Sequence, residues 1–293
     1  MVILAILLTN LFIKTRMNIL KKLLLPCILL FNLDMAGQNA TLAKTWESDS
    51  SFKVPECVLY SPAENILYVS NIDGKSSEKD LKGSISKVSP DGKTMTHNWA
   101  INLSAPKGMG IYEKKLFVAD LQEVVVIDLN SGDILERIVV PGSVFLNDVT
   151  IAANGTVYVS DSHTGKVHQL KKSVVSTYLE NKVSINGLYA DGNDLYLAVK
   201  DTLYKADNNK ILSVIATGMD ESSDGIEMTN NKDFIVSCWN GIIYHIKKDG
   251  SKNVLLDTRE QKINAADIGF DKAKNILYVP TFFNNKVVAY QLK

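Results

Sequence analysis

The feature that most limits how this 293-residue chain can fold is a pattern that occurs six times along it, with a period of about forty residues. Each copy runs as an apolar strand, a short polar turn, a strand of the type ILYVS, a loop and a third strand. The copies cover residues 55–74, 106–129, 146–170, 185–207, 223–246 and 265–292. Asn, Asp and Gly mark the turns, as in AANGT and ADGND, and a fourth strand follows between copies.

Six four-stranded units of this length predict an all-β protein, a six-bladed β-propeller. In that fold each unit is a blade of four antiparallel strands, and the blades stand around a central channel. The last copy ends at Lys293 after only three strands. We therefore predict that residues 42–50, LAKTWESDS, supply the missing outer strand, because this closure covers an otherwise open sheet edge.

The N-terminus differs from the repeats and is predicted to be a secretory signal peptide covering residues 1–40. Lys21 and Lys22 precede an apolar run over 23–33, and small residues follow it. The alternative is a membrane anchor, but the run is shorter than the ~20 apolar residues that a spanning helix needs. We expect export to the periplasm or the medium, with residues 1–16 as an upstream extension and residues 41–293 as the propeller domain.

Composition excludes some partners. The chain has 32 basic and 32 acidic residues and a formal net charge of zero, so no one-sided field attracts nucleic acid or an acidic membrane. We expect a small-molecule substrate, no membrane contact after signal cleavage, and a monomer. Cys57 and Cys238 are the cysteines outside the predicted signal, and both are expected to be small buried residues because two distant cysteines make no disulfide framework.

Polar residues recur where the first strand of each copy begins. Since the innermost strands of a propeller line its axis, equivalent positions on six blades form a ring. The ring consists of Glu56, Lys107, Asn147, Asn186, Asp224 and Ala266. Two carboxylates and two amide oxygens are hard donors that suit calcium, with magnesium, manganese or zinc as alternatives. The competing interpretation is that polar side chains gather there only to pair with backbone groups and channel water.

The next column of the alignment contains Asp148 and Asp267. These carboxylates are candidates to orient ligands or to contact a solute, and a purely structural hydrogen-bonding role is the alternative. Asn71, Asp120 and Asp161 end equivalent strands, and their repetition predicts turn hydrogen bonds within blades rather than chemistry.

These residues resemble the gluconolactonase, regucalcin and senescence marker protein family of six-bladed calcium propellers, with diisopropyl fluorophosphatase as a cousin. The resemblance extends from about residue 42 to the end and rests on PECVLYSPAENILYVSN, LNDVTIAANGTVYVSDS, INGLYADGNDLYLA and SDGIEMTNNKDFIVSCWNG. It implies that Glu56, Asn147, Asn186 and Asp224 hold a catalytic calcium, with Asn147 also contacting substrate. It further implies hydrolysis of a small lactone or ester with Asp224 as nucleophile or general base.

Two departures limit what the resemblance implies. Phe145 stands where lactonases of the group have an arginine that grips a sugar acid, so a sugar-acid lactone is not expected. Lys107 puts a cation into the ring, where it either lowers metal affinity, points to solvent, or binds an anionic part of the substrate. The alternative function is a non-catalytic propeller that binds a ligand or a protein partner and has a structural metal. His163 and His168 are expected at the surface and outside the chemistry.

Overall fold

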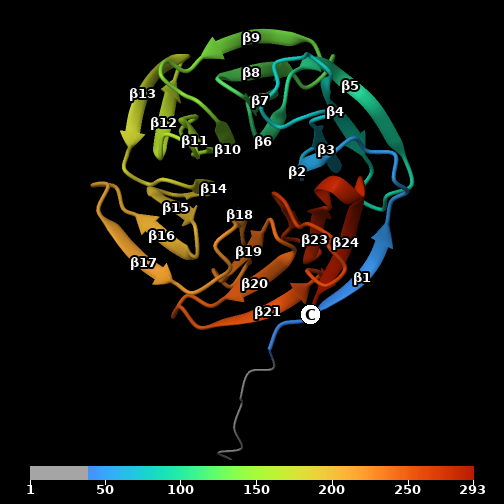
Figure 1. Cartoon of the computed structure of the whole chain (residues 1–293), viewed down its shortest axis with the longest axis vertical. Coiled ribbons are helices and arrows are strands. Elements are labelled where there is room, and N and C mark those ends of the chain that lie inside the picture. Colours follow the sequence, from blue (N-terminus) through green and yellow to red (C-terminus); the bar gives the residue numbers. More distant parts are fainter. Residues whose placement is uncertain (1–38) are drawn as a thin grey trace, which may run out of the picture. The chain divides into compact units, whose positions relative to one another are not determined.

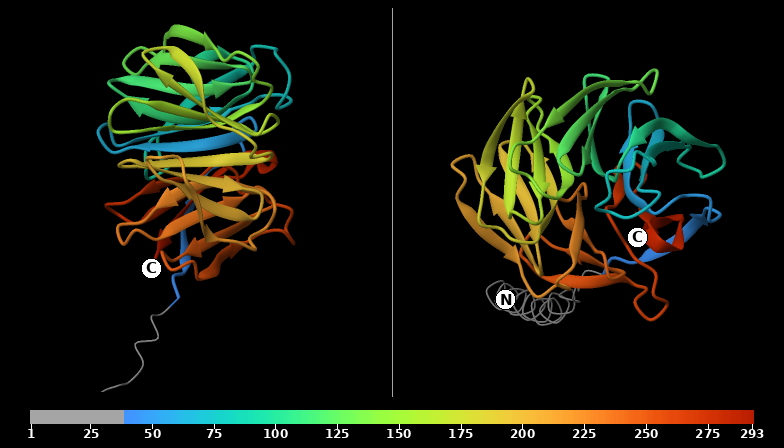
Figure 2. Two further views of the ribbon diagram at one scale, coloured as in Figure 1. Left: turned by 90° about the vertical axis from the view of Figure 1, so that its left-hand side faces the viewer. Right: turned by 45° about the horizontal axis from the view of Figure 1, so that its top comes forward.

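The described part of the chain, residues 39–293, is built from 24 β-strands. In this computed structural model they form six separate four-stranded sheets, which stand as blades around one axis (Figure 1). Figure 2 shows the blades from two further directions. The predicted six-bladed propeller is therefore confirmed. The predicted signal peptide and its extension lie outside the described residues except for Asn39 and Ala40.

Blades 1 to 5 each take four consecutive strands. Blade 1 contains β2 (Pro55–Ser61), β3 (Ile66–Asn71), β4 (Gly83–Val88) and β5 (Met95–Leu103). Blade 2 contains β6 (Pro106–Tyr112), β7 (Lys115–Asp120), β8 (Glu123–Asp128) and β9 (Ile134–Val139). Blade 3 contains β10 (Leu146–Ile151), β11 (Val157–Asp161), β12 (Lys166–Lys171) and β13 (Val174–Leu179). Blade 4 contains β14 (Ile185–Asp191), β15 (Asp194–Val199), β16 (Thr202–Ala206) and β17 (Leu212–Ala216). Blade 5 contains β18 (Ser223–Met228), β19 (Phe234–Cys238), β20 (Ile242–Ile246) and β21 (Lys252–Asp257).

Blade 6 joins the two ends of the described chain. Its strands are β22 (Gly269–Asp271), β23 (Ile276–Pro280), β24 (Val287–Leu292) and, outermost, β1 (Leu42–Glu47). The antiparallel pairing of β1 with β24 runs from Leu42 opposite Leu292 to Glu47 opposite Val288, and Figure 1 shows the two strands side by side. The predicted closure of the last blade by an N-terminal strand is confirmed.

Burial differs between inner and outer strands because neighbouring blades cover the inner ones. Every residue of β19 is buried, whereas the outer strand β13 has only exposed and half-buried residues. Apolar clusters fill the spaces between blades, for example around Tyr68 of blade 1 and Leu116 of blade 2. The predicted surface position of His168 is wrong: it is 3% exposed, because its strand β12 also lies between neighbouring blades. His163 is exposed as expected.

Cys57 and Cys238 are buried and form no disulfide, as predicted. The short 3-10 helix η1 (Phe282–Asn284) interrupts blade 6 between β23 and β24. Within residues 39–293, no helix has the length and apolar character needed to cross a membrane.

Candidate functional site

The ring lies at bulges where the inner strands begin. In blade 3 the pairing of β10 with β11 is interrupted between Leu146 and Val149, and four other blades have the same irregularity. A bulge re-aims side chains next to it. Polar residues are tolerated here because Asn147 and Asp148 lie inside the interruption and not in the regular ladder.

Serine hydroxyls on the second strand replace part of the interrupted ladder. In three blades they accept the backbone N–H of the residue after the ring position, each across 2.9 Å; the pairs are Cys57–Ser70, Asp148–Ser160 and Gly225–Ser237. The other blades carry Ala119, Ala198 and Pro280 at that position. The sequence predictions missed these serines, although the recurring YVS and IVS motifs carried the signal.

The structure brings Glu56, Asn186 and Asp224 close together at the axis. Glu56 is 5% and Asp224 is 3% exposed. Burial raises the pKa of both carboxyl groups well above the usual range, and the charge of Asp224 raises that of Glu56 further. For Asp224 the second cause is Asp148, and a side-chain hydrogen bond from Asn186 acts in the opposite direction.

Two ring oxygens are left without a hydrogen-bond partner. They are Oε2 of Glu56 and Oδ1 of Asn186, and both are buried. The described residues contain nine such side-chain atoms. Two of the nine belong to the six-residue ring, so unpartnered acceptors are enriched there. A buried acceptor with no donor costs about 1–3 kcal/mol. A bound cation would satisfy these oxygens and reduce the repulsion between the two carboxylates.

The oxygen donors of the ring suit a hard cation, although they are not a cluster of the side chains that most often bind metals. Over residues 39–293, no group of three or more His, Cys, Asp or Glu side chains is arranged to hold a metal. The ring instead offers carboxylate oxygens from Glu56 and Asp224 with amide oxygens from Asn147 and Asn186. Asn147 is 8% exposed, and its Nδ2 donates to Ser162 Oγ across 3.0 Å.

Lys107 is fully buried in the ring, with 1% exposure. Its Nζ donates to the carbonyls of Ser76 at 3.1 Å and Ala105 at 2.9 Å, and it lies 4.4 Å from the centre of the Phe145 ring. Burial lowers the pKa of this amine to about 8, which the charge of Glu56 partly opposes. The alternative in which Lys107 points to solvent is wrong, because the β3–β4 loop that contains Ser76 covers it.

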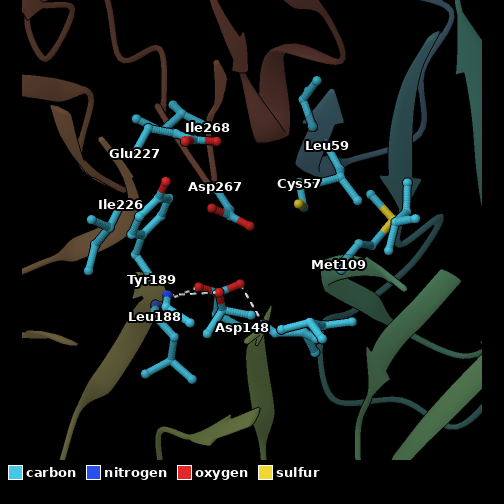
Figure 3. A pocket seen from close by; sticks show the side chains of 17 residues that line it. Cys57, Leu59, Met109, Asp148, Leu188, Tyr189, Ile226, Glu227, Asp267 and Ile268 are labelled. Carbon is cyan, nitrogen blue, oxygen red and sulfur yellow. Dashed lines mark hydrogen bonds between the residues drawn. The ribbon is translucent and has the colours of Figure 1, made fainter. Parts of the chain in front are cut away.

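Asp148 and Asp267 form a second acidic layer along the axis. Asp148 accepts the backbone N–H groups of Val149 and Leu188, both at 2.6 Å, and therefore joins blade 3 to blade 4. Asp267 joins blade 6 to blade 1 through its backbone, because its N–H donates to Glu56 O at 2.9 Å. Burial raises the pKa of Asp148 to about 6. Figure 3 shows the two carboxylates directed toward one another across the cavity.

Glycines make room for this second layer. A Cβ on Gly108 would lie 2.3 Å from Asp148 Oδ1, and a Cβ on Gly225 would lie 2.3 Å from Asp267 Oδ1. Both distances are far below ordinary contact, so a side chain at either position would displace a carboxylate. The residues that follow the ring residues are therefore as constrained as the ring itself.

A cavity of about 250 Å³ lies on the axis next to the second layer. Its polar lining includes Asp148, Asp267 and Glu227, and its apolar walls include Leu59 and Met109 (Figure 3). Burial raises the pKa of Glu227 to about 8. The cavity gives the channel room for a solute or water on the side of the ring toward which the inner strands run.

Aromatic residues from blades 5 and 6 pack beside the ring. Trp239 lies 5.4 Å from Phe282 and 5.9 Å from Phe283, between ring centres and with edge contacts. Phe282 is buried and belongs to one apolar cluster with Ala266, the ring residue of blade 6. Phe283 is 65% exposed. The cluster is thus mainly core packing, with one aromatic side chain open to solvent.

The polar residues predicted to be structural have that role. Asp120 accepts two backbone N–H groups of the loop before β6, and Asp161 accepts two from the loop before β10. Asn71 donates to Val69 O at 3.0 Å. These bonds fix the chain immediately before the ring residues of blades 2 and 3.

No protein-family model and no curated protein sequence matches this chain. Solved structures do. A gluconolactonase from Xanthomonas campestris has a TM-score of 0.66 and 16% identity, covering 84% of this chain and 88% of the other. A streptogramin B lyase has a TM-score of 0.62 and 11% identity, covering 87% and 98%. A luciferin-regenerating enzyme has a TM-score of 0.61 and 14% identity, covering 86% and 95%.

The chain has the fold of these propellers. The predicted resemblance to gluconolactonase-like proteins is thus confirmed for the fold. One fold hosts many activities, so similarity at such low identity shows the fold alone.

Proposed function

We propose that this protein is a metal-dependent hydrolase of the gluconolactonase-like type, which acts on a small lactone or ester with calcium on the propeller axis. The proposal is supported by two buried oxygens without hydrogen-bond partners, Glu56 Oε2 and Asn186 Oδ1. They lie beside the other carboxylate of the ring, that of Asp224. Oxygen donors with no sulfur or imidazole favour calcium, and magnesium, manganese or zinc are the alternatives.

The residues proposed to hold the ion are Glu56, Asn147, Asn186 and Asp224. When bound, the metal supplies Lewis-acid polarisation of the substrate carbonyl and favours ionisation of a water. Asp224 is the proposed nucleophile or general base. Its position supports that role, because it lies beside Glu56 and Asn186 and would be close to a substrate carbonyl held at the same ion.

The proposed substrate contacts are Asn147, Lys107 and Asp148. An ammonium group has three donors, and the carbonyls of Ser76 and Ala105 use two of those on Lys107. The third is the one proposed to donate to an anionic or carbonyl oxygen of the substrate. For Asp148 the substrate contact stays a prediction, since both of its oxygens already accept a backbone N–H.

Phe145 favours a substrate without a sugar acid. It stacks on His163 with 4.6 Å between ring centres, where the resemblance would place a guanidinium group. An apolar surface at this point suits the hydrocarbon part of an ester or lactone.

One observation favours the second candidate, a non-catalytic propeller that uses its metal for rigidity. Glu56, Lys107, Asn147 and Asp224 are between 1% and 8% exposed, so a substrate would need the covering loop to move before it reached them. A buried ion would require no such opening. The two candidates share the metal and differ in turnover.

The test is an activity screen of the protein with lactones, aryl esters and organophosphates, in calcium and in chelator. We expect turnover that chelator removes and that Asp224→Asn lowers about 100-fold or more. Asp249→Asn, in an exposed turn, is the matched control and should keep full activity.

Calcium binding is measured in parallel by calorimetry. Binding without turnover on any substrate class would favour the non-catalytic candidate. Absence of binding for calcium and also for magnesium, manganese and zinc would remove both, since each depends on the same ring.

A further inference from the structure

Ser162 stands out beside the ring because its hydroxyl touches one ring side chain and the strand that carries another. It lies in the turn after β11 and is half-buried. Its Oγ accepts a hydrogen bond from Asn147 Nδ2 at 3.0 Å and donates one to the carbonyl of Ile185 at 2.6 Å. Ile185 directly precedes Asn186, the neighbouring amide of the ring.

The direction of these two bonds determines how the Asn147 amide is turned. A serine hydroxyl has one proton, and a backbone carbonyl can only accept. The short bond to Ile185 O therefore uses that proton, and toward Asn147 the Ser162 oxygen can only accept. It must face the NH₂ group, since an amide turned by a half rotation would set two acceptors against each other. The carbonyl oxygen of Asn147 is consequently directed away from Ser162.

Backbone bonds make Ser162 a junction between the entries of two inner strands. Its N–H donates to Phe145 O and its carbonyl accepts from Ser184 N–H, both at 3.0 Å. One residue thus contacts the chain two positions before each of the two amides, and holds the Asn147 side chain as well.

Comparison of the six blades shows that Ser162 is one of two polar residues in its column and the only one with a hydroxyl. The residues at the same position, directly after the second strand's repeated motif, are Ile72, Leu121, Lys200, Trp239 and Phe282. Four of these five are members or neighbours of one apolar cluster around the channel. Packing therefore explains the apolar residues of the column, but it does not explain a hydroxyl in blade 3.

We infer that Ser162 is a positioning residue, which orients the amide oxygen of Asn147 toward the proposed metal and couples it to the strand that carries Asn186. This inference rests on the proposed function of the ring. Partners that orient metal ligands through a hydrogen bond typically change metal affinity about 10- to 100-fold when they are removed.

The test compares three variants by calcium calorimetry and by NMR of the Asn147 side-chain amide. For Ser162→Ala we expect calcium affinity to fall at least about tenfold, with a shifted or broadened Asn147 NH₂ signal in the metal-free protein. Ser162→Thr keeps the hydroxyl and should restore both properties. Ser143→Ala is the control, because Ser143 is a buried loop serine that donates to Val140 O at 2.8 Å without touching a ring residue.

The outcomes separate this inference from the proposed function. If Ser162→Ala and Ser143→Ala lower the melting temperature alike while calcium affinity and the Asn147 signal stay unchanged, Ser162 is only structural and the inference is overturned. If the wild type binds neither calcium nor magnesium, manganese or zinc, the proposed function fails and the NMR comparison alone decides. An unchanged Asn147 signal in Ser162→Ala would then refute the orientation, and a changed one would uphold it without a metal.

Discussion

Two successive acidic layers on the propeller axis are equally buried but differ in their hydrogen bonds. In the ring, Glu56 keeps an oxygen without any partner. One residue further along the strands, Asp148 accepts a backbone N–H on each oxygen, one from its own blade and one from the next. Burial alone therefore does not distinguish the proposed ligand ring from a structural clamp. The two layers differ in that Glu56 has an acceptor oxygen without a hydrogen-bond partner.

The largest expected effect comes from breaking the clamp in the second layer. Asp148→Ala should lower the free energy of unfolding by about 3–5 kcal/mol, because two buried N–H groups lose a charged acceptor. Glu56→Gln should leave the metal-free protein unchanged or more stable, since it removes a buried charge, and should abolish stabilisation by calcium. Urea unfolding with and without calcium measures both. Equal losses in the two variants would contradict the distinction between the layers.

The next effect concerns pH and an acid still further along the axis. Burial raises the pKa of Glu227 to about 8 from an ordinary value of 4.5. The folded state therefore keeps a proton that the unfolded state releases between these values. Stability is highest below pH 4.5 with respect to this group and decreases as pH rises toward 8, by at most about 1.4 kcal/mol per pH unit.

Glu227→Gln removes that dependence and serves as the matched comparison. The difference in unfolding free energy between wild type and variant should grow in favour of the variant from pH 5 to pH 8, in urea titrations at each pH. A constant difference over this interval would mean that Glu227 ionises normally.

The smallest effect belongs to the serines that repair the bulges. Ser160→Ala removes the acceptor of the Asp148 N–H and should cost about 1 kcal/mol, a decrease of about 2–4 °C in melting temperature for a domain of this size. Amide exchange at Asp148 should accelerate. Ser176→Ala, on the outer strand β13, should change neither quantity. A loss as large as that of Asp148→Ala would show that the serine, and not the carboxylate, is the main clamp.

The sequence was sufficient for the fold because the information is periodic. Six copies of one strand pattern define the blades, and the sixth copy lacks an outer strand, which predicted the pairing of residues 42–47 with the C-terminal strand. The same alignment predicted that Glu56, Asn186 and Asp224 meet at the axis, since equivalent positions on a rotationally repeated structure must face one centre.

What the sequence could not reveal depends on loops and on packing between blades. Lys107 was placed in the ring, but its burial depends on the carbonyl of Ser76 in an irregular loop that has no counterpart in other copies. His168 was misjudged because a polar side chain on a third strand looks exposed until the adjacent blade is added. Ser162 could have been noticed as the one hydroxyl in its column, although its two hydrogen bonds needed coordinates.

The pairing of β1 with β24 has a consequence for how this molecule is made. The strand of the propeller that a ribosome produces first, β1, can pair only after β24 has been made, because Leu42 lies opposite Leu292. Until these two strands pair, each of them has an edge with unpaired backbone N–H and C=O groups. The propeller therefore closes in a single step, the pairing of β1 with β24, and the exposed edge of β1 has to be protected from other strands before that step.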